Sequence, residues 1–276
     1  MSTVKTSTFH HYLTEGFRPT TAEIELGEIG LKHNILEENL LGTSSLSTDG
    51  WKSFFFIGKD EFLALKNLLT RHIKSLLEEH QSIDSDFRLE EYHKHVLSDT
   101  IHYAVSSWAM SDEVIGKHYA HIKAQMEKLL GTVLTTKEIE HKGAKGRFLG
   151  FRIVRPGKSD HNPYHRDAWL PYWRDTINVW IPICGFENGN TISLIPGSHT
   201  LDDSEILKTK RGAVIGEKTY HVPEAVAINT PFEKISPSLQ EGEGLIFSPY
   251  LIHGNGKNNL VDTTRVSIEL RFCRSV

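Results

Sequence analysis

The chain has 276 residues, 38 % of them hydrophobic, which is enough for one large domain with a substantial core. Its formal net charge of −4 argues against the broad basic surface of a nucleic-acid-binding protein, and its 2 cysteines are too few for a disulfide scaffold. Because no apolar segment near the N-terminus reaches the length of a signal peptide or a membrane span, we expect a cytoplasmic protein without nucleic-acid or membrane partners. The oligomeric state stays open.

Apolar residues recur at helical spacing in two segments of the first half, residues 60–79 and 111–131. Ser111 is a favourable N-cap for the second segment, and Gly131 is a favourable end. We expect a further helix around residues 87–97, extending towards Trp108. The predicted packing faces consist of Phe62, Leu65, Leu69, Ile73 and Leu76 in the first helix and of Ile115, Tyr119, Ile122, Met126 and Leu129 in the last.

The pattern changes to short, alternating, β-branched segments after about Val133. In the last of these, apolar and polar side chains alternate, and "TINVWIPI" (residues 176–183) shows the same division. Charged side chains on one face of a buried strand need a wet cavity or a ligand. We therefore predict one domain over residues 1–276 that is mainly β with flanking α. Residues 1–132 form a largely helical flank, and residues 133–276 form a barrel with a polar lumen.

The segment "NPYHRDAW" (residues 162–169) places an imidazole and a carboxylate one residue apart, at His165 and Asp167. On an extended chain both side chains project to the same side. The pair alone is just as compatible with a structural hydrogen bond. His253, in "SPYLIHGNGKNN", offers a third donor after an apolar strand. Two imidazoles and one carboxylate that leave adjacent positions open are typical of the facial triad of non-haem Fe(II) oxygenases.

Arg265 follows this triad on the polar face of the last predicted strand, and Ser267 lies on the same face. A guanidinium can hold a carboxylate through two parallel hydrogen bonds, and the serine hydroxyl can add a third. An arginine placed to hold a dicarboxylate beside an iron triad suggests 2-oxoglutarate as co-substrate, with O2 bound next to it.

Four motifs in this half occur together: H-x-D, "IPGSH" (residues 195–199), "GEGLIFSPYLIHGNG" (residues 242–256) and "TTRVS" (residues 263–267). Over roughly Phe148 to Phe272, their order and spacing resemble the phytanoyl-CoA dioxygenase-like family of Fe(II)/2-oxoglutarate oxygenases. The resemblance implies a double-stranded β-helix, which is a cupin-like jelly roll, packed against N-terminal helices. It also implies Fe(II) on the triad and the C5 carboxylate of 2-oxoglutarate on Arg265 and Ser267, with Trp180 or Asn178 as a further contact to the co-substrate.

The substrate has to be predicted from the loops and the polar faces. No basic site for coenzyme A is evident, and the polar insertion of about residues 200–238 is lid-like, so we expect a small, polar, possibly anionic molecule. Arg152 and Arg155 have opposite parity, so only one of them can enter the lumen of a regular strand. His161 and Trp173 are further candidates near the mouth. The alternative roles are surface ion pairs for the arginines, a solvated loop for His161 and packing under a loop for Trp173.

The expected reaction is hydroxylation of an unactivated C–H bond with release of succinate and CO2. Asp167 favours this outcome, because the related halogenases lack the carboxylate. One alternative is a non-oxidative cupin-type metalloenzyme, an isomerase or a lyase, which would not need Arg265. The other is a ligand-binding jelly roll without catalysis, which would not need the open metal positions.

Overall fold

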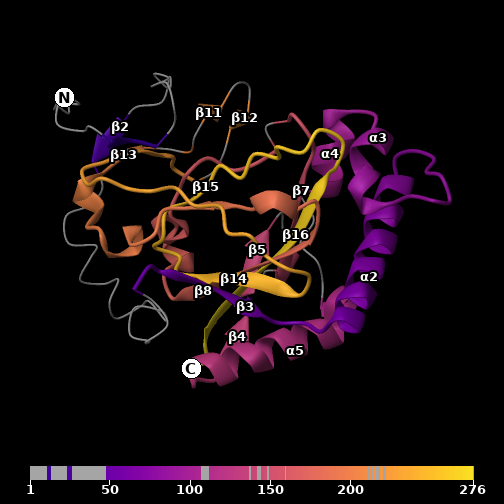
Figure 1. The fold of residues 1–276 in the computed structure, drawn as a ribbon, viewed down its shortest axis with the longest axis horizontal. Coiled ribbons are helices and arrows are strands. Elements are labelled where there is room, and N and C mark those ends of the chain that lie inside the picture. The colour runs from indigo at the N-terminus through magenta and orange to yellow at the C-terminus, as the bar shows by residue number, and fades with distance from the viewer. Residues whose placement is uncertain are drawn as a thin grey trace.

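The computed structural model describes residues 11–13, 24–26, 48–106, 112–136, 138–141, 144–147, 149–158, 160–210, 212, 214–215, 218–219 and 222–275. Antiparallel sheets form the centre of the molecule, and the long helices pack outside them (Figure 1). In the described part of the chain, no helix combines the length and the apolar character needed to cross a lipid bilayer.

Two long helices, α2 (Lys59–Glu78) and α5 (Asp112–Leu130), confirm the helical periodicity of the sequence. The predicted stripe of α2 is buried throughout, and Tyr119, Ile122 and Met126 of α5 are buried as well. Gly131 ends α5 with a φ of +64°, which suits glycine. The predicted N-cap Ser111 and the side chain of Ile115 lie outside the described residues.

The third predicted helix is instead three short pieces, η2 (Leu89–Glu91), α3 (Tyr92–His95) and α4 (Asp99–Ser106). The break follows from local hydrogen bonds. Val96 is extended, and Ser98 accepts the N–H of Ile101 through its hydroxyl and so starts a new helix. Gln81, just beyond α2, bridges the break by donating to the carbonyl of His95 and accepting the N–H of Leu97.

The major sheet has six strands: β3 (Trp51–Phe55), β14 (Glu243–Phe247), β8 (Thr176–Cys184), β16 (Arg265–Arg274), β4 (Leu134–Thr136) and β7 (Leu149–Val154). All pairings are antiparallel, and β16 lies between β8 on one side and β7 with β4 on the other. The register pairs Ser267 with Arg152 and Arg271 with Asn178, so polar residues of neighbouring strands lie side by side.

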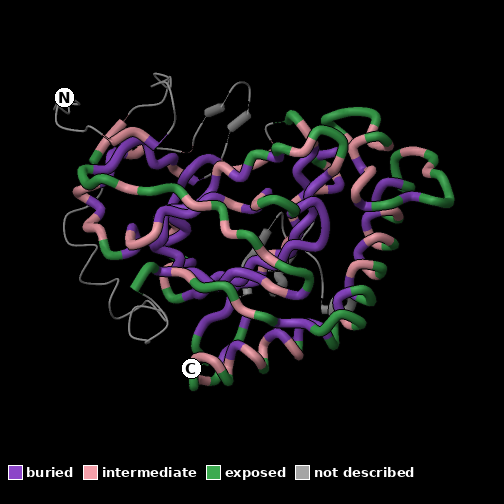
Figure 2. The backbone as a smooth tube through the Cα atoms, in the orientation of Figure 1, coloured by how far each residue is buried: buried purple, intermediate pink, exposed green. Residues whose placement is uncertain are grey.

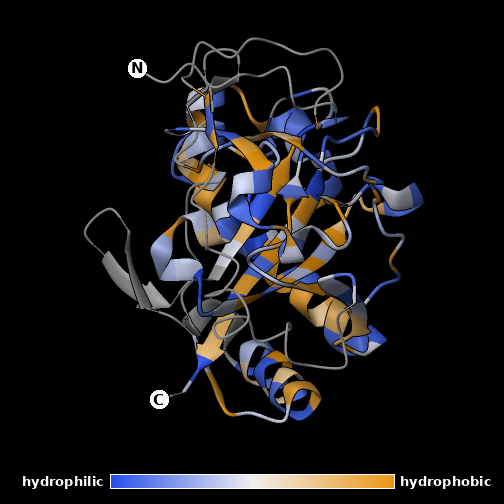
Figure 3. Ribbon diagram, turned by 90° about the vertical axis from the view of Figure 1, so that its left-hand side faces the viewer, coloured by the Kyte–Doolittle hydropathy of each residue, from blue (hydrophilic) through white to orange (hydrophobic). Residues whose placement is uncertain are grey.

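The alternation predicted for β8 and β16 is confirmed. The apolar residues of one face belong to the largest core cluster together with the buried stripes of α2 and α5. They are Ile177, Val179, Ile181, Val266, Ile268, Leu270 and Phe272. Figure 2 shows the strands buried, while the helices alternate between buried and exposed turns; in Figure 3 the strands are mainly hydrophobic and the helices are two-sided. The polar face of β16 therefore points away from the helices, into the β layers.

The opposing layer is built from short strands. β1 (His11–Tyr12), β13 (Ala225–Ile228), β10 (Ile206–Thr209) and β2 (Ile24–Leu26) form one sheet, and β9 (Ser193–Leu194) pairs with β15 (His253–Gly254). The chain around Tyr164 and His165 connects them, because Ala225 donates to the Tyr164 carbonyl at 2.7 Å and His165 forms a bridge with His253. Two antiparallel layers with helices outside are the predicted jelly roll.

The polar insertion around residues 200–238 contains four short strands among its described residues. β10 and β13 lie inside the opposing layer, and Ile206, Leu207 and Ala225 to Ile228 are buried there. The hairpin of β11 (Val214–Ile215) and β12 (Lys218–Thr219) lies between these two strands in the sequence. A second hairpin, β5 (Glu138–His141) with β6 (Ala144–Arg147), precedes β7. Closure of part of the insertion over the site stays a prediction.

Candidate metal and co-substrate site

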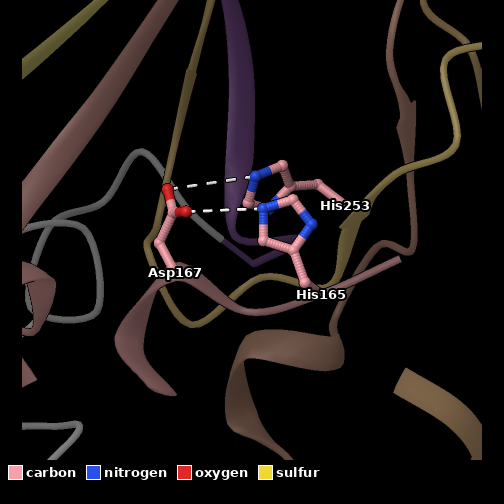
Figure 4. A group of neighbouring side chains, drawn as sticks. All are labelled: His165, Asp167 and His253. Carbon is pink, nitrogen blue, oxygen red and sulfur yellow. Dashed lines mark ion pairs between the residues drawn. The ribbon is translucent and has the colours of Figure 1, made fainter. Parts of the chain in front are cut away.

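His165, Asp167 and His253 lie together, although His253 is far from the other two in the sequence (Figure 4). His165 lies outside the named strands but forms a β-bridge with His253 of β15: it donates its backbone N–H to the His253 carbonyl at 2.9 Å, and His253 returns a bond of 3.0 Å. Asp167 opens the short 3-10 helix η3 (Asp167–Trp169), which turns its carboxylate back towards both imidazoles. All three residues are buried.

The distances between the donor atoms suit one small cation. His165 Nε2 lies 3.4 Å from Asp167 Oδ1, His253 Nε2 lies 3.9 Å from Asp167 Oδ2, and all three donors lie within 4.8 Å of one another. Donors bound at about 2.1 Å and at right angles around one ion lie about 3 Å apart. The group is therefore close to the spacing of a facial triad and needs only a small contraction to reach it.

Both imidazoles are fixed in the tautomer that a metal needs. The Nδ1 atom of His165 lies 2.7 Å from the Pro163 carbonyl, and the Nδ1 atom of His253 lies 3.0 Å from the Leu251 carbonyl. A carbonyl oxygen can only accept, so each Nδ1 carries the proton and each Nε2 presents a lone pair to the site. Metal-bound histidines are held by second hydrogen bonds of this kind.

The surroundings of the triad favour an ionised carboxylate at Asp167 and a neutral imidazole at His253. Burial by itself raises the pKa of Asp167, but Arg271 and the two histidines outweigh it and hold that pKa well below its ordinary value. Burial, reinforced by His165, lowers the pKa of His253 to about 4. At neutral pH Asp167 is therefore an anionic donor and His253 a neutral one, which is the form in which each binds a divalent metal.

A cavity of about 50 Å³ extends from His165 and His253 between the two layers. Arg265 lines it and is 3 % exposed. Its guanidinium donates to the backbone carbonyls of Asn190, Thr191 and Gly256, while its Nε has no hydrogen-bond partner and no carboxylate lies within ion-pair distance in the described part of the chain. Burial lowers the pKa of Arg265 to about 10. A buried cation without a counter-charge is costly, so the site fits an anionic ligand.

The other residues predicted for the co-substrate also lie in this region. Ser267 and Trp180 line the cavity, and Trp180 belongs to an apolar cluster with Leu194, Leu245, Phe247 and Leu251. Asn178 lines it too, but its amide donates to Asp167 Oδ2 at 2.8 Å, and its own Oδ1 is buried without a partner. Their contacts with 2-oxoglutarate stay predictions.

The structure separates the four residues predicted for the substrate. Arg152 and His161 line the cavity, and Arg152 donates to Glu269 on the adjacent strand at 3.0 Å. Arg155 turns the other way, as its parity requires, and is ion-paired with Asp160 and Asp99. Trp173 is not among the lining residues; its ring lies 4.6 Å below the guanidinium carbon of Arg271.

Two site residues were not singled out from the sequence. Arg271 and Glu269 lie on the polar face of β16 and line the cavity, and Arg271 donates to Asp167 Oδ2 at 2.9 Å from Nη2 and 3.3 Å from Nε. The alternation of β16 was the available signal. It showed that these side chains face the lumen, but parity does not identify the partner that each one meets.

The comparisons with known proteins agree with this geometry. A search of curated proteins finds no match. Among solved structures, AviO1 from Streptomyces viridochromogenes Tue57 is 15 % identical with a TM-score of 0.51, and the match covers 85 % of this chain and 98 % of that one. The non-heme monooxygenase ThoJ is 16 % identical with a TM-score of 0.50 and coverages of 82 % and 75 %. Likenesses at this identity show the fold alone.

The family comparison goes further than the fold. The family model of phytanoyl-CoA dioxygenase matches residues 59–262, which is most of the chain and includes all three candidate metal ligands. Enzymes of this family use Fe(II), 2-oxoglutarate and O2. The family match and the jelly roll together confirm the resemblance seen in the sequence: this chain belongs to the phytanoyl-CoA dioxygenase family of Fe(II)- and 2-oxoglutarate-dependent oxygenases.

Proposed function

We propose that the chain hydroxylates an unactivated C–H bond of a small polar substrate, with release of succinate and CO2. The observation that carries the proposal is Arg265, a buried guanidinium without a carboxylate partner among the described residues, in the cavity that His165 and His253 also line. A non-oxidative cupin-type enzyme needs the triad but has no use for such an anchor.

Each residue has a role that follows from its contacts. The Nε2 atoms of His165 and His253 and the carboxylate of Asp167 would hold Fe(II), which supplies the centre at which O2 is activated at the expense of 2-oxoglutarate. Arg265 and Ser267 would anchor the distal carboxylate of the keto acid by charge-assisted hydrogen bonds. Trp180, with the apolar cluster around it, keeps bulk water away from that side of the site.

Asp167 supports hydroxylation as the outcome. Its carboxylate takes the position that a halide would need, and it is held in place by Asn178 and Arg271. We infer that no ligand position is left over for halogenation once the two co-substrates have bound.

The substrate would bind at the wall formed by Arg152, Glu269 and His161. The Arg152 side chain is 41 % exposed, so its guanidinium is accessible from the cavity while its Nε is held by Glu269. A guanidinium in this position favours a substrate with a carboxylate, phosphonate or similar anionic group. The lining also holds several charged side chains beside its apolar ones, which suits a small molecule with an anionic group.

The proposal is tested by a panel of small polar metabolites scored by 2-oxoglutarate-dependent succinate release. We expect Asp167→Ala and His253→Ala to abolish both metal binding and succinate release, because each removes one of the three donors. His80→Ala, at an exposed position beyond α2, is the control for loss of an imidazole and should behave as wild type. Full succinate release by either triad variant would refute the assignment.

An anaerobic assay separates the proposal from its non-oxidative alternative. We expect conversion of an active substrate to stop when O2 or 2-oxoglutarate is withheld. Conversion that continues without both would show an isomerase or a lyase on the same scaffold. A protein that binds no iron and releases no succinate with any compound would instead fit a ligand-binding jelly roll.

A further inference from the structure

The two oxygens of the Asp167 carboxylate have different surroundings. Oδ1 faces His165 Nε2 at 3.4 Å. Oδ2 accepts three hydrogen bonds, one of 2.8 Å from Asn178 and two, of 2.9 and 3.3 Å, from Arg271. A carboxylate oxygen that accepts this many bonds has little lone-pair capacity left, so the two oxygens are not equivalent as metal donors.

The two donors come from neighbouring strands of the major sheet. Arg271 on β16 and Asn178 on β8 are direct cross-strand partners, so the backbone pairing fixes both at the same level of the sheet. Asp167 reaches them from the opposing layer, after the strand pair of His165 and His253. The hydrogen bonds to Oδ2 therefore tie one metal ligand to a layer that contributes none of the three ligands.

Arg271 is itself held in one orientation. Its side chain is 9 % exposed, and its guanidinium carbon lies 4.6 Å from the centre of the Trp173 ring, which is buried. Stacking on an indole suits a planar guanidinium and not a lysine ammonium. Glu269 lies two residues away on the same strand and, with Asp167, balances the charge of Arg271.

We propose that Arg271, supported by Asn178 and Trp173, is a positioning residue that engages Asp167 Oδ2 and so presents Oδ1 alone to the metal. Without this restraint both carboxylate oxygens can reach the ion, and the second would take a position that the keto acid or O2 requires. The inference rests on the proposed metal site, and it concerns the binding of the metal before any co-substrate is present.

The experiment is a titration of the purified full chain with Mn(II) alone, followed by electron paramagnetic resonance, which measures free metal and reports the symmetry of the bound ion. Arg271→Lys keeps the positive charge and removes the planar, stacked donor. We expect it to weaken Mn(II) binding by roughly tenfold, as for other residues that orient a metal ligand. We also expect it to change the spectrum of the bound ion, because the carboxylate changes its binding mode.

Arg88→Lys is the matched control, since the same substitution is made at an exposed residue that does not line the cavity. It should leave both the Mn(II) affinity and the spectrum unchanged. Trp173→Leu removes only the stack and leaves both hydrogen-bond donors in place. It should weaken Mn(II) binding by roughly threefold, and it tests the proposal even if Arg271→Lys does not fold.

Wild-type affinity and an unchanged spectrum in folded Arg271→Lys or Trp173→Leu would overturn the proposal. An arginine that serves only the keto acid or the substrate gives this result, because neither is present in the titration. A variant that yields less folded protein, but whose folded fraction gives the wild-type Mn(II) spectrum, would equally overturn the proposal and indicate a purely structural role. If wild-type protein binds no Mn(II) or Fe(II), the metal site itself fails, and the positioning role fails with it.

Discussion

Arg265 shows how a single side chain can define a binding site. Its Nη1 and Nη2 atoms donate to carbonyl oxygens, which supply no negative charge, and its Nε has no partner among the described residues. The desolvation free energy of this buried cation is offset when an anion binds beside it. Gly256 permits the arrangement, because a Cβ there would lie 2.9 Å from Nη2 of Arg265.

At this scale we predict that Arg265→Lys weakens 2-oxoglutarate binding by roughly tenfold or more while Mn(II) binding is retained. The ammonium keeps the charge but loses the planar fork that matches a carboxylate. Calorimetric titration of the Mn(II)-loaded protein with 2-oxoglutarate measures the effect. Unchanged affinity for the keto acid would mean that its distal carboxylate binds elsewhere.

The triad and Arg265 could be proposed from the sequence because each lies in a short motif. Asp167 faces the histidines through the turn of η3 and not, as the sequence suggested, on an extended segment. The role of Arg271 could not be proposed in this way. Its partners, Asp167 and Trp173, lie in a segment that reaches it only through the packing of one layer on the other. The sequence shows which face of β16 Arg271 occupies, but not what stands opposite that face.

At the scale of elements, the two histidines depend on how closely two strands approach. Gly254 follows His253 with a φ of +133°, and a Cβ on it would lie 2.2 Å from the Pro163 carbonyl oxygen. That same oxygen accepts the Nδ1 proton of His165. The absence of a side chain at residue 254 therefore allows the backbone contact that orients the neighbouring ligand.

We predict that Gly254→Ala lowers Mn(II) affinity by roughly tenfold or more, because the methyl group displaces the Pro163 carbonyl and with it the orientation of the His165 ring. The same metal titration measures the loss. Gly58→Ala is the control, since residue 58 has a φ of −67° and a Cβ there meets no atom within 4 Å. A folded Gly254→Ala protein with wild-type metal affinity would contradict the argument.

The elements themselves were predicted unevenly. α2 and α5 have long, regular apolar stripes and appear where the sequence places them. The stretch after residue 87 was predicted as one helix, but side-chain hydrogen bonds from Gln81 and Ser98 divide it, and such competing local bonds leave no periodic signal. The insertion was predicted as a polar, lid-like segment. Its strands β10 and β13 were not predicted, because they are short and pair with strands that are distant in the sequence.

At the scale of the whole molecule, several ionisable groups are buried away from the site. His199, in the turn of the "IPGSH" motif, is 2 % exposed, and its ring packs so closely on residue 50 that only glycine fits there. Burial, reinforced by Arg166, lowers the pKa of His199 from 6.5 to about 4. In the unfolded chain the ring regains its ordinary pKa, so between pH 6.5 and 4 the unfolded state binds the proton and the folded state does not.

The metal-free protein should therefore lose stability as the pH falls from 6.5 towards 4, by about 1.4 kcal/mol per pH unit for this one group. We predict that His199→Gln reduces the pH dependence of the free energy of unfolding by about one proton in that window. Denaturant titrations at several pH values, with His80→Ala as the exposed control, measure it. Parallel curves for wild type and His199→Gln would show that this ring is protonated equally in both states.

The division of labour between the two layers has one further consequence. All three candidate metal ligands belong to the opposing layer, whereas Arg265 and Ser267 belong to the major sheet. If the keto acid binds as proposed, its two ends must reach both layers at once, so the distance between the layers should select its length. We expect a homologue one methylene shorter or longer to bind more weakly.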